Sequence, residues 1–331
     1  MTEAAVTTHP PIDRAPPAGP ARRESGSGAS AWHRFAESDL IFEYRRSPTA
    51  VVASLVSLAY VVAALAPDLV APSRVFDLTQ ISLRDAFLPP AWLEGGQARF
   101  LFGTDDQGRD VLSAIIYGLR VSMFVGLASV ALALAIGVPL GLMAGFVGGF
   151  VDSAVMRLAD IQLTFPAILV AVLIDGAARA AIGSGAHDRL VVWILILAIG
   201  LSGWVQYART VRGATMVEKR REYVQAARLL DLPVWQVLLR HILPNVLTSV
   251  LVLATVHLAV AIILEATLSF VGLGIPPTQP SLGTLIRVGS AFLMSGEWWI
   301  AIFPGLVLLV LVLVVNLLGD WLRDVLNPKL R

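Results

Sequence analysis

Six long apolar stretches dominate the chain, with polar segments between them. A helix needs about twenty residues to cross the hydrocarbon layer of a bilayer, and the stretches are close to that length. The third is the weakest, because Asp160 and Gln162 lie early in it and Pro166 interrupts its backbone hydrogen bonds. The pattern predicts an all-α polytopic membrane protein with six transmembrane helices, at Thr49–Ala66, Val121–Ala144, Met156–Leu173, Leu190–Tyr207, Val246–Phe270 and Ile300–Leu318.

The composition agrees with a membrane protein and excludes several kinds of chemistry. Apolar residues make up 56% of the 331, charged residues 15%, and mean hydropathy is +0.74, outside the range of soluble globular proteins. With no cysteine, the chain forms no disulfide, thiolate metal site or cysteine nucleophile. It also lacks the phosphate-binding pattern G-x-x-x-x-G-K-[ST], so it does not hold nucleotide phosphates by the usual loop.

The distribution of Lys and Arg predicts how the chain is oriented. With the N-terminus inside, 17 of the 25 basic residues fall on the inner side, seven on the outer side, and Arg120 at a boundary. This bias follows the positive-inside rule, and clusters that flank apolar stretches do not indicate nucleic acid binding. We expect a cytoplasmic disordered tail with an interfacial helix (1–46), a first transmembrane helix (47–67), an extracytoplasmic loop (68–118), a membrane-spanning core with a cytoplasmic loop at 208–245 (119–325), and a cytoplasmic C-terminus (326–331).

The polar segment between the fourth and fifth stretches has the pattern of two short helices. Neither Gly nor Pro occurs from Glu218 to Leu230. Apolar residues recur through it at helical spacing, at Val217, Val224, Ala227 and Leu229 or Leu230. Asp231 is expected to end this helix, and a second is predicted from Leu232 to Leu243, closed by Pro244. Two short helices at an angle would form a docking element.

Within the outer loop, the string F-G-T-D-D-Q-G-R-D places carboxylates beside an arginine. Its candidate residues are Gly103, Asp105, Asp106, Gly108, Arg109 and Asp110. The glycines suit tight turns. We expect Asp106 or Asp110 to pair with Arg109, and Asp105 to cap the following helix. A cation held by the three carboxylates is the alternative, since hard cations bind carboxylate oxygens.

Two ionisable residues lie within the fifth stretch, where polar groups are costly. His257 is near its middle, and Glu265 is about two turns further along. One interpretation makes them residues of a translocation path or gate. The other has them hydrogen-bond to a neighbouring helix or a partner subunit. Eight residues along a helix turn the two side chains roughly 80° apart, so they form a poor acid/base pair.

Glycines recur along and after the second stretch. They are Gly137, Gly141, Gly145, Gly148 and Gly149. Small residues at four-residue intervals allow close contact between helices, which predicts an interface within the chain or with another subunit. The turn from Gly145 to Gly149 could flex.

Several strings occur together, and in the same order, in a known family of transport proteins. They include Phe102–Val111, Leu264–Gly274 and Asn316–Asp324. The central segment also follows the pattern E-A-A, three residues, Gly, nine residues, I-x-L-P. Gln225, Ala226 and Ala227 fill its first positions, Asp231 stands where Gly is usual, and His241, Leu243 and Pro244 fill the last. From about residue 40 to its end, the chain therefore resembles the second (C-type) permease of the dipeptide, oligopeptide and nickel ABC importers.

The resemblance implies the type I importer permease fold and a transport subunit that is not itself an enzyme. It implies no cofactor on this chain, with ATP and Mg on two partner ATPases. A homologous second permease and an extracytoplasmic binding protein would complete the importer, in a bacterial inner membrane. The implied ATPase contact comprises Glu222, Tyr223, Gln225, Ala226, Ala227, Asp231, Arg240, Leu243 and Pro244. The solute would be a peptide or a nickel chelate. A proton-coupled secondary transporter that uses His257 and Glu265 is the alternative function.

Overall fold

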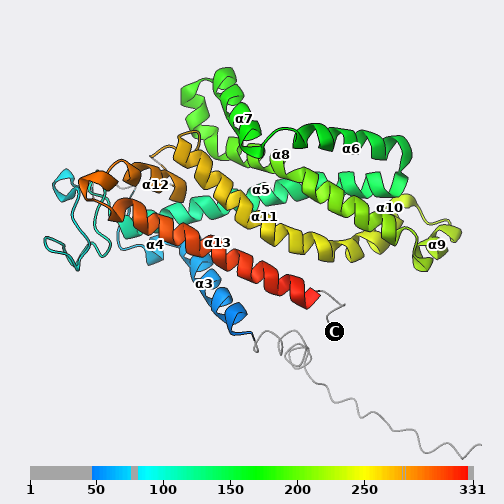
Figure 1. Ribbon diagram of the computed structural model, residues 1–331, viewed down its shortest axis with the longest axis horizontal. Helices are drawn as coiled ribbons and strands as arrows, with labels where there is room; N and C mark the ends of the chain where they lie inside the picture. Colours follow the sequence, from blue (N-terminus) through cyan, green and yellow to red (C-terminus); the bar gives the residue numbers. More distant parts are fainter. Residues whose placement is uncertain (1–46, 76–80, 278, 280, 327–331) are drawn as a thin grey trace, which may run out of the picture. The chain divides into compact units, whose positions relative to one another are not determined.

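The computed structural model describes residues 47–75, 81–277, 279 and 281–326, all within one compact unit of the chain. The tail and interfacial helix expected at 1–46 lie outside the described residues, as do 327–331. The described elements are helices, and extended backbone pairs only in an isolated bridge between Thr104 and Asp110 within this part of the chain. Figure 1 shows the all-α architecture that the sequence predicts.

Five helical stretches are long and apolar enough to cross a membrane. They are α3 (Pro48–Leu65), α5 (Val111–Val147), α8 (Ser184–Glu218), α11 (Leu243–Val271) with the short elements that precede it, and α13 (Trp299–Leu326). A sixth candidate is the bent pair α6 (Gly149–Leu163) and α7 (Ala167–Ile182). The shorter elements are α4 (Pro67–Val70), η1 (Leu83–Asp85), α9 (Glu222–Leu229), α10 (Val234–Gln236), η2 (Val237–Ile242), α12 (Leu282–Ser290) and η3 (Leu293–Ser295).

The predicted third span is broken, as Pro166 indicated, but it is not one helix from Met156 to Leu173. α6 and α7 meet at 88° across residues 164–166. Pro166 has extended backbone geometry and precedes the first residue of α7. Because proline donates no backbone hydrogen bond and clashes with the preceding turn, α6 ends before it.

The bent pair counts as one crossing because the helices on either side of it are parallel. A Cβ atom at Gly141 would lie 2.6 Å from the Ala208 carbonyl oxygen, and one at Gly145 would lie 2.7 Å from that of Arg212. Residue numbers thus rise in the same direction along α5 and α8. The chain between them must return through α6 and α7, which makes six crossings. The predicted glycine interface is confirmed as a contact within the chain at Gly137, Gly141 and Gly145, whereas a Cβ atom at Gly148 or Gly149 would meet nothing within 4 Å.

Two helices extend beyond their predicted spans, and one predicted helix end is wrong. α5 begins at Val111, inside the segment assigned to the outer loop, because Asp110 caps it. α8 continues past Tyr207 to Glu218, beyond the predicted span. Pro244 does not close a short helix but lies in the first turn of α11. The π-helix η2 carries the chain into α11, and its wider turn accommodates a proline that lacks an N–H.

Candidate functional site

The segment expected to dock a partner forms a folded element at one end of the helical bundle. Figure 1 shows α9 at the end where α5 and α8 finish and the α10–α11 stretch begins. Val224 is fully buried and Ala227 is 5% exposed, and both belong to the largest hydrophobic core cluster. These two side chains anchor α9 to the hydrophobic core of the bundle. Since Ala227 faces inward, it is not part of an outward contact as the sequence suggested, whereas Ala226 is exposed.

Tyr223 ties the element to both neighbouring helices. Its hydroxyl donates to Glu218 Oε2 at 2.5 Å, and Asn245 Nδ2 donates to the same hydroxyl at 2.9 Å. Burial, together with the nearby Glu218 carboxylate, raises the pKa of Tyr223. Gln225 donates to the Arg220 carbonyl at 3.1 Å, which closes the turn before α9. The first turn of α9 is therefore tied to both α8 and α11.

The backbone geometry at Asp231 explains why glycine is usual at this position of the motif. Its φ is +51°, in the left-handed region where a side chain is strained. Asp is among the few non-glycine residues that adopt this geometry readily. The chain reverses here, and the Leu232 N–H bonds back to the Ala227 carbonyl at 3.3 Å. The departure from the motif therefore preserves the backbone shape.

The outward surface of this element is more apolar than the sequence suggested. Leu229 is 86% exposed, Leu230 75%, Val234 54% and Trp235 65%. Helical spacing had assigned Leu229 or Leu230 to the inner face, but both point outward, because Val224 and Ala227 define the inner face of α9 and Leu229 lies about 200° round the helix from Ala227. We call these four residues the α9 tip. Of the other candidate residues, Glu222, Arg240 and Pro244 are exposed and Leu243 is partly buried.

The aspartates of the outer motif exchange the roles predicted for them. Asp105, not Asp106 or Asp110, pairs with Arg109, whose Nε donates to Oδ2 at 2.7 Å. Asp110, not Asp105, caps α5 by accepting from the Ser113 N–H at 2.9 Å. Burial raises the pKa of both Asp110 and Asp106. Gly103 and Gly108 have φ of +78° and +76°, as turns require.

The outer motif works as a structural clasp. Arg109 donates to the Pro277 carbonyl at 3.2 Å, and the Trp299 indole donates to the Thr104 carbonyl at 3.0 Å. The loop is thereby fixed to the segment after α11 and to the start of α13. Among the described residues, no group of three or more His, Asp or Glu could hold a metal ion, so the cation alternative has no support.

His257 and Glu265 are buried inside the packing of this chain. His257 Nδ1 lies 2.9 Å from the Tyr207 hydroxyl on α8, and its ring occupies the space that Gly203 leaves open. Glu265 has no exposed surface. Both belong to helix contacts within the chain, as the structural interpretation expects.

Three serines surround the Glu265 carboxylate. Ser269 donates to Oε1 at 2.8 Å, and the hydroxyls of Ser122 and Ser281 approach the group. Oε2 has no hydrogen-bond partner in the described part of the chain. Since Ser281 caps α12 and Ser122 lies on α5, Glu265 stands where three helices meet.

A buried pair on α7 and α8 was missed by sequence reasoning. His187 Nε2 lies 2.8 Å from Asp175 Oδ1, and both side chains are almost completely buried. Their separation of twelve residues crosses the turn at Gly183, so no single helical spacing signals it. The pair joins the middle of α7 to the first turn of α8.

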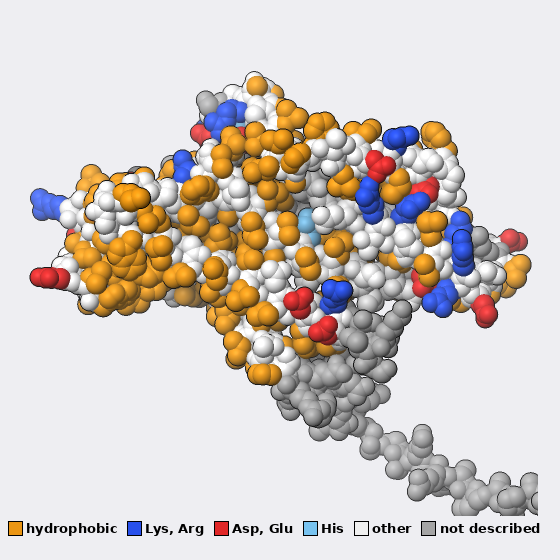
Figure 2. All heavy atoms as spheres, viewed as in Figure 1, with side chains coloured by type: hydrophobic (Ala, Val, Ile, Leu, Met, Phe, Trp, Pro, Cys, Tyr) orange, Lys and Arg blue, Asp and Glu red, His pale blue; other side chains and the backbone are white. Residues whose placement is uncertain are grey.

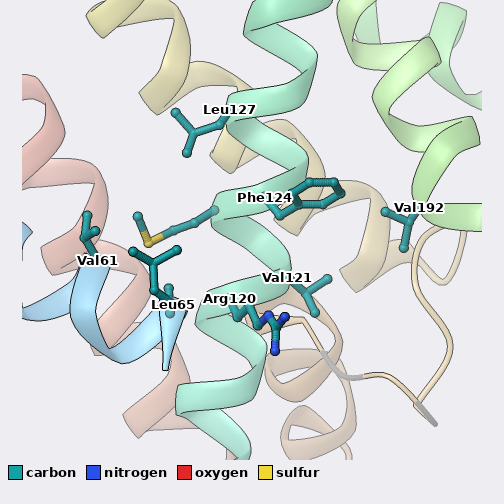
Figure 3. A pocket seen from close by; sticks show the side chains of 9 residues that line it. Val61, Leu65, Arg120, Val121, Phe124, Leu127 and Val192 are labelled. Carbon is teal, nitrogen blue, oxygen red and sulfur yellow. The ribbon is translucent and has the colours of Figure 1, made fainter. Parts of the chain in front are cut away.

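An open pocket of about 450 Å³ lies between α3, α5 and α8, and Figure 3 shows the side chains that line it. Its walls are apolar side chains, such as Val61, Leu65 and Phe124, with Arg120 at one edge. This lining offers hydrophobic contact and no acid, base or nucleophile. The pocket therefore provides no catalytic site.

Comparison with known proteins identifies the family. Residues 137–331 match the family described as "Binding-protein-dependent transport system inner membrane component". The chain is 39% identical to the dipeptide transport system permease protein DppC of Escherichia coli K12 over 91% of its length and 92% of that protein. It is 37% identical to DppC of Haemophilus influenzae over 88% of its length and 94% of that protein. The di/tripeptide permease DppC of Pseudomonas aeruginosa is 41% identical over 75% of this chain and 78% of its own.

Solved structures show the same fold at lower sequence identity. A chain from inward-facing structures of the MetNI methionine ABC transporter superposes with a TM-score of 0.52 at 19% identity, over 65% of this chain and 96% of its own. At that identity the likeness supports the fold alone. Together with the family match and the relatives, it shows that this multi-pass membrane protein belongs to the family of binding-protein-dependent transport system inner membrane components, as an ABC importer permease of the C type.

Proposed function

We propose that this permease imports peptides, and that the α9 tip docks it to a cytoplasmic ATPase. The peptide assignment is supported by the relatives, which are named as dipeptide and di/tripeptide permeases. A homologous second permease would complete the passage, and an extracytoplasmic binding protein would deliver the solute. ATP and Mg would be held by two partner ATPases, so that this chain transmits motion and performs no chemistry.

The observation that carries the docking proposal is the contrast within the α9 element. Its inner side is anchored by Val224 and Ala227, while the tip exposes four large apolar side chains. A rigid element with an exposed apolar surface is suited to fill a cleft on a partner, because hydrophobic burial drives association without bending the element. Movement of the partner would then reach α8 and α11, which flank α9 in sequence and bond to Tyr223.

Charge supports a cytoplasmic position for this end. Lys219, Arg220, Arg221 and Arg240 lie beside α9, and Figure 2 shows basic side chains gathered at the corresponding end of the molecule. Lys and Arg are retained on the cytoplasmic side of membrane proteins. With six crossings, both termini would then lie in the cytoplasm. The proton-coupled alternative has no support, since His257 and Glu265 belong to separate buried groups.

Purification and reconstitution of the transporter test the proposal. A tagged chain should copurify with an ATPase, and vesicles containing the whole complex should accumulate dialanine only with ATP and the binding protein. Changing Leu229 and Leu230 to Ser should lower ATPase recovery at least about tenfold, because burying two leucines contributes roughly 3 kcal/mol or more. Leu58→Ser, on the exposed side of α3, is the control and should leave ATPase recovery unchanged. Full ATPase recovery with the double variant would contradict docking through the tip.

A further inference from the structure

Helix α6 has three different faces. Val155, Ala159 and Gln162 pack towards α8. Phe150, Leu158, Ile161 and Phe165 form an exposed apolar row along α6 and into the break that follows it. Ser153, Arg157, Asp160 and Thr164 form an exposed polar row, spaced four, three and four residues apart. Such spacing keeps side chains on one side of a helix. α6 therefore presents a polar and an apolar surface side by side.

A matching row lies on α8. Its members are Ser202, Gln206, Arg209 and Gly213, at the same spacing, and all but the partly buried Ser202 are exposed. The two rows meet where Arg209 pairs with Asp160, with 47% and 57% of these side chains exposed. Figure 2 shows acidic and basic side chains together over α6 and the adjoining half of α8. We call the two rows the polar track.

The track lies on helices that are candidate membrane spans. Asp160 is eleven residues into α6, within the bent pair that counts as one crossing, and Arg209 lies nine residues before the end of α8. Charged side chains within a span face protein or water, because exposure to lipid is costly. The break at residues 164–166 adds backbone groups that also require polar surroundings.

Water with a passing solute fits the track better than a packed helix does. Arg157 and Gln206 are exposed and form no hydrogen bond or ion pair within the described part of the chain. A partner helix packed over them would have to supply matching groups for every one, since buried polar groups without partners are destabilising. Water supplies such partners at once. The hydroxyl, amide and charged side chains of the track can together donate hydrogen bonds to water and accept them from it.

We infer that the polar track lines the solute passage, and that the Asp160–Arg209 pair binds the charged ends of a passing peptide. The inference rests on the proposed function. A peptide with free ends carries an ammonium and a carboxylate, which match Asp160 and the planar fork of Arg209. Its entry exchanges one ion pair for two, and its departure restores the original pair. Such exchange avoids leaving a charge unpaired and favours a contact weak enough to release the solute.

Cysteine labelling in the assembled transporter tests the lining, since the chain has no cysteine of its own. Ser153→Cys and Thr164→Cys replace track residues. Leu158→Cys and Ile161→Cys are controls on the same helix at similar depth. A charged, membrane-impermeant thiosulfonate should label the track cysteines at least about tenfold faster, because its thiolate target forms only in water. Saturating dialanine should slow labelling of Thr164→Cys. Equal rates on the two faces, or labelling that dialanine leaves unchanged, would overturn the inference.

The ion pair is tested by adding Asp160→Asn or Arg209→Gln to the Thr164→Cys variant. Each should raise the dialanine concentration that halves labelling by about tenfold, the effect of losing one charged contact. Asp152→Asn is the control, because Asp152 pairs with Arg212 in a less exposed position at the other end of α6. An unchanged dialanine concentration in both variants would contradict binding at this pair. If the unmodified complex imports dialanine while these tests fail, the inference alone is wrong. If it imports none, the proposed solute is wrong.

Discussion

Two helices of this chain expose rows of identical geometry and opposite chemistry. α13 exposes Ile302, Leu306, Leu309 and Leu313, each between 41% and 59%. The polar track on α6 exposes four residues at the same four, three and four spacing, yet they are two hydroxyl-bearing residues, a base and an acid. The exposed fraction of a side chain in a single membrane protein chain therefore does not say whether that side chain faces lipid or water. The composition of the exposed row indicates which, because charged groups are costly in lipid and well solvated in water.

The α9 tip adds a third kind of surface to this comparison. It is as apolar as the α13 row but lies beyond the long helices, among basic residues. An apolar row along a span indicates lipid, whereas an apolar tip outside the span indicates a protein partner. Position along the helix axis thus has to be read together with composition.

The largest expected effect comes from placing a charge on the lipid-facing row. Leu309→Asp should reduce the yield of monodisperse protein from membranes severalfold or more, because an Asp near the centre of a span costs roughly 3 kcal/mol. Thr164→Asp is the matched control on the polar track, and we expect it to retain most of the yield. Size-exclusion chromatography of membrane extracts measures both. Equal losses would show that the two rows share one environment.

The next prediction concerns the close packing of α5 against α8 at Gly141. Gly141→Ala should lower thermal stability by about 1 to 3 kcal/mol, since the added methyl would lie 2.6 Å from the Ala208 carbonyl oxygen. Gly305→Ala on α13 is the control, as a Cβ there meets no atom within 4 Å. Its denaturation midpoint should stay the same or rise slightly. A Gly141→Ala protein as stable as its parent would mean that α5 and α8 separate easily.

The next prediction concerns Glu265, a carboxylate buried between helices. It tests whether a polar group inside the helix packing needs hydrogen-bond partners, as the exposed polar groups do. Glu265→Leu should destabilise the protein by about 1 to 3 kcal/mol, because the surrounding serine hydroxyls lose their acceptor. Glu265→Gln keeps an acceptor oxygen and should be milder. Thermal unfolding in detergent compares the two variants. Equal stability of the Leu and Gln variants would contradict the hydrogen-bonding role given to Glu265.

Much of this architecture was predictable because it depends on local patterns. Long apolar stretches gave the spans, Pro166 the break in the third, and the glycine spacing the contact between α5 and α8. Boundaries were harder to predict. Helix α8 runs beyond its apolar stretch because Thr215 and neighbouring residues pack on α5, and such contacts between distant segments leave no periodic signal.

The candidate sites were less predictable for the same reason. Which aspartate pairs with Arg109 depends on the turn at Gly108, and the direction of Leu229 depends on which face of α9 packs on the core. The polar track was present in the sequence as Ser153, Arg157, Asp160 and Thr164. Its partner row on α8 and the ion pair between them emerge only when the chain has folded back through α7.

The smallest expected effect tests how the shape of the α9 tip is maintained. Asp231→Gly should stabilise the protein by up to about 1 kcal/mol, because glycine adopts a φ of +51° without strain. Asp231→Val is the control with the opposite expectation, since a β-branched residue is poorly tolerated in this region. Hydrogen exchange at the Leu232 amide, which bonds to the Ala227 carbonyl, should slow in the Gly variant and accelerate in the Val variant. Faster exchange in the Gly variant would mean that the Asp231 side chain itself stabilises the turn, and that the tip owes its exposure to that side chain rather than to backbone geometry.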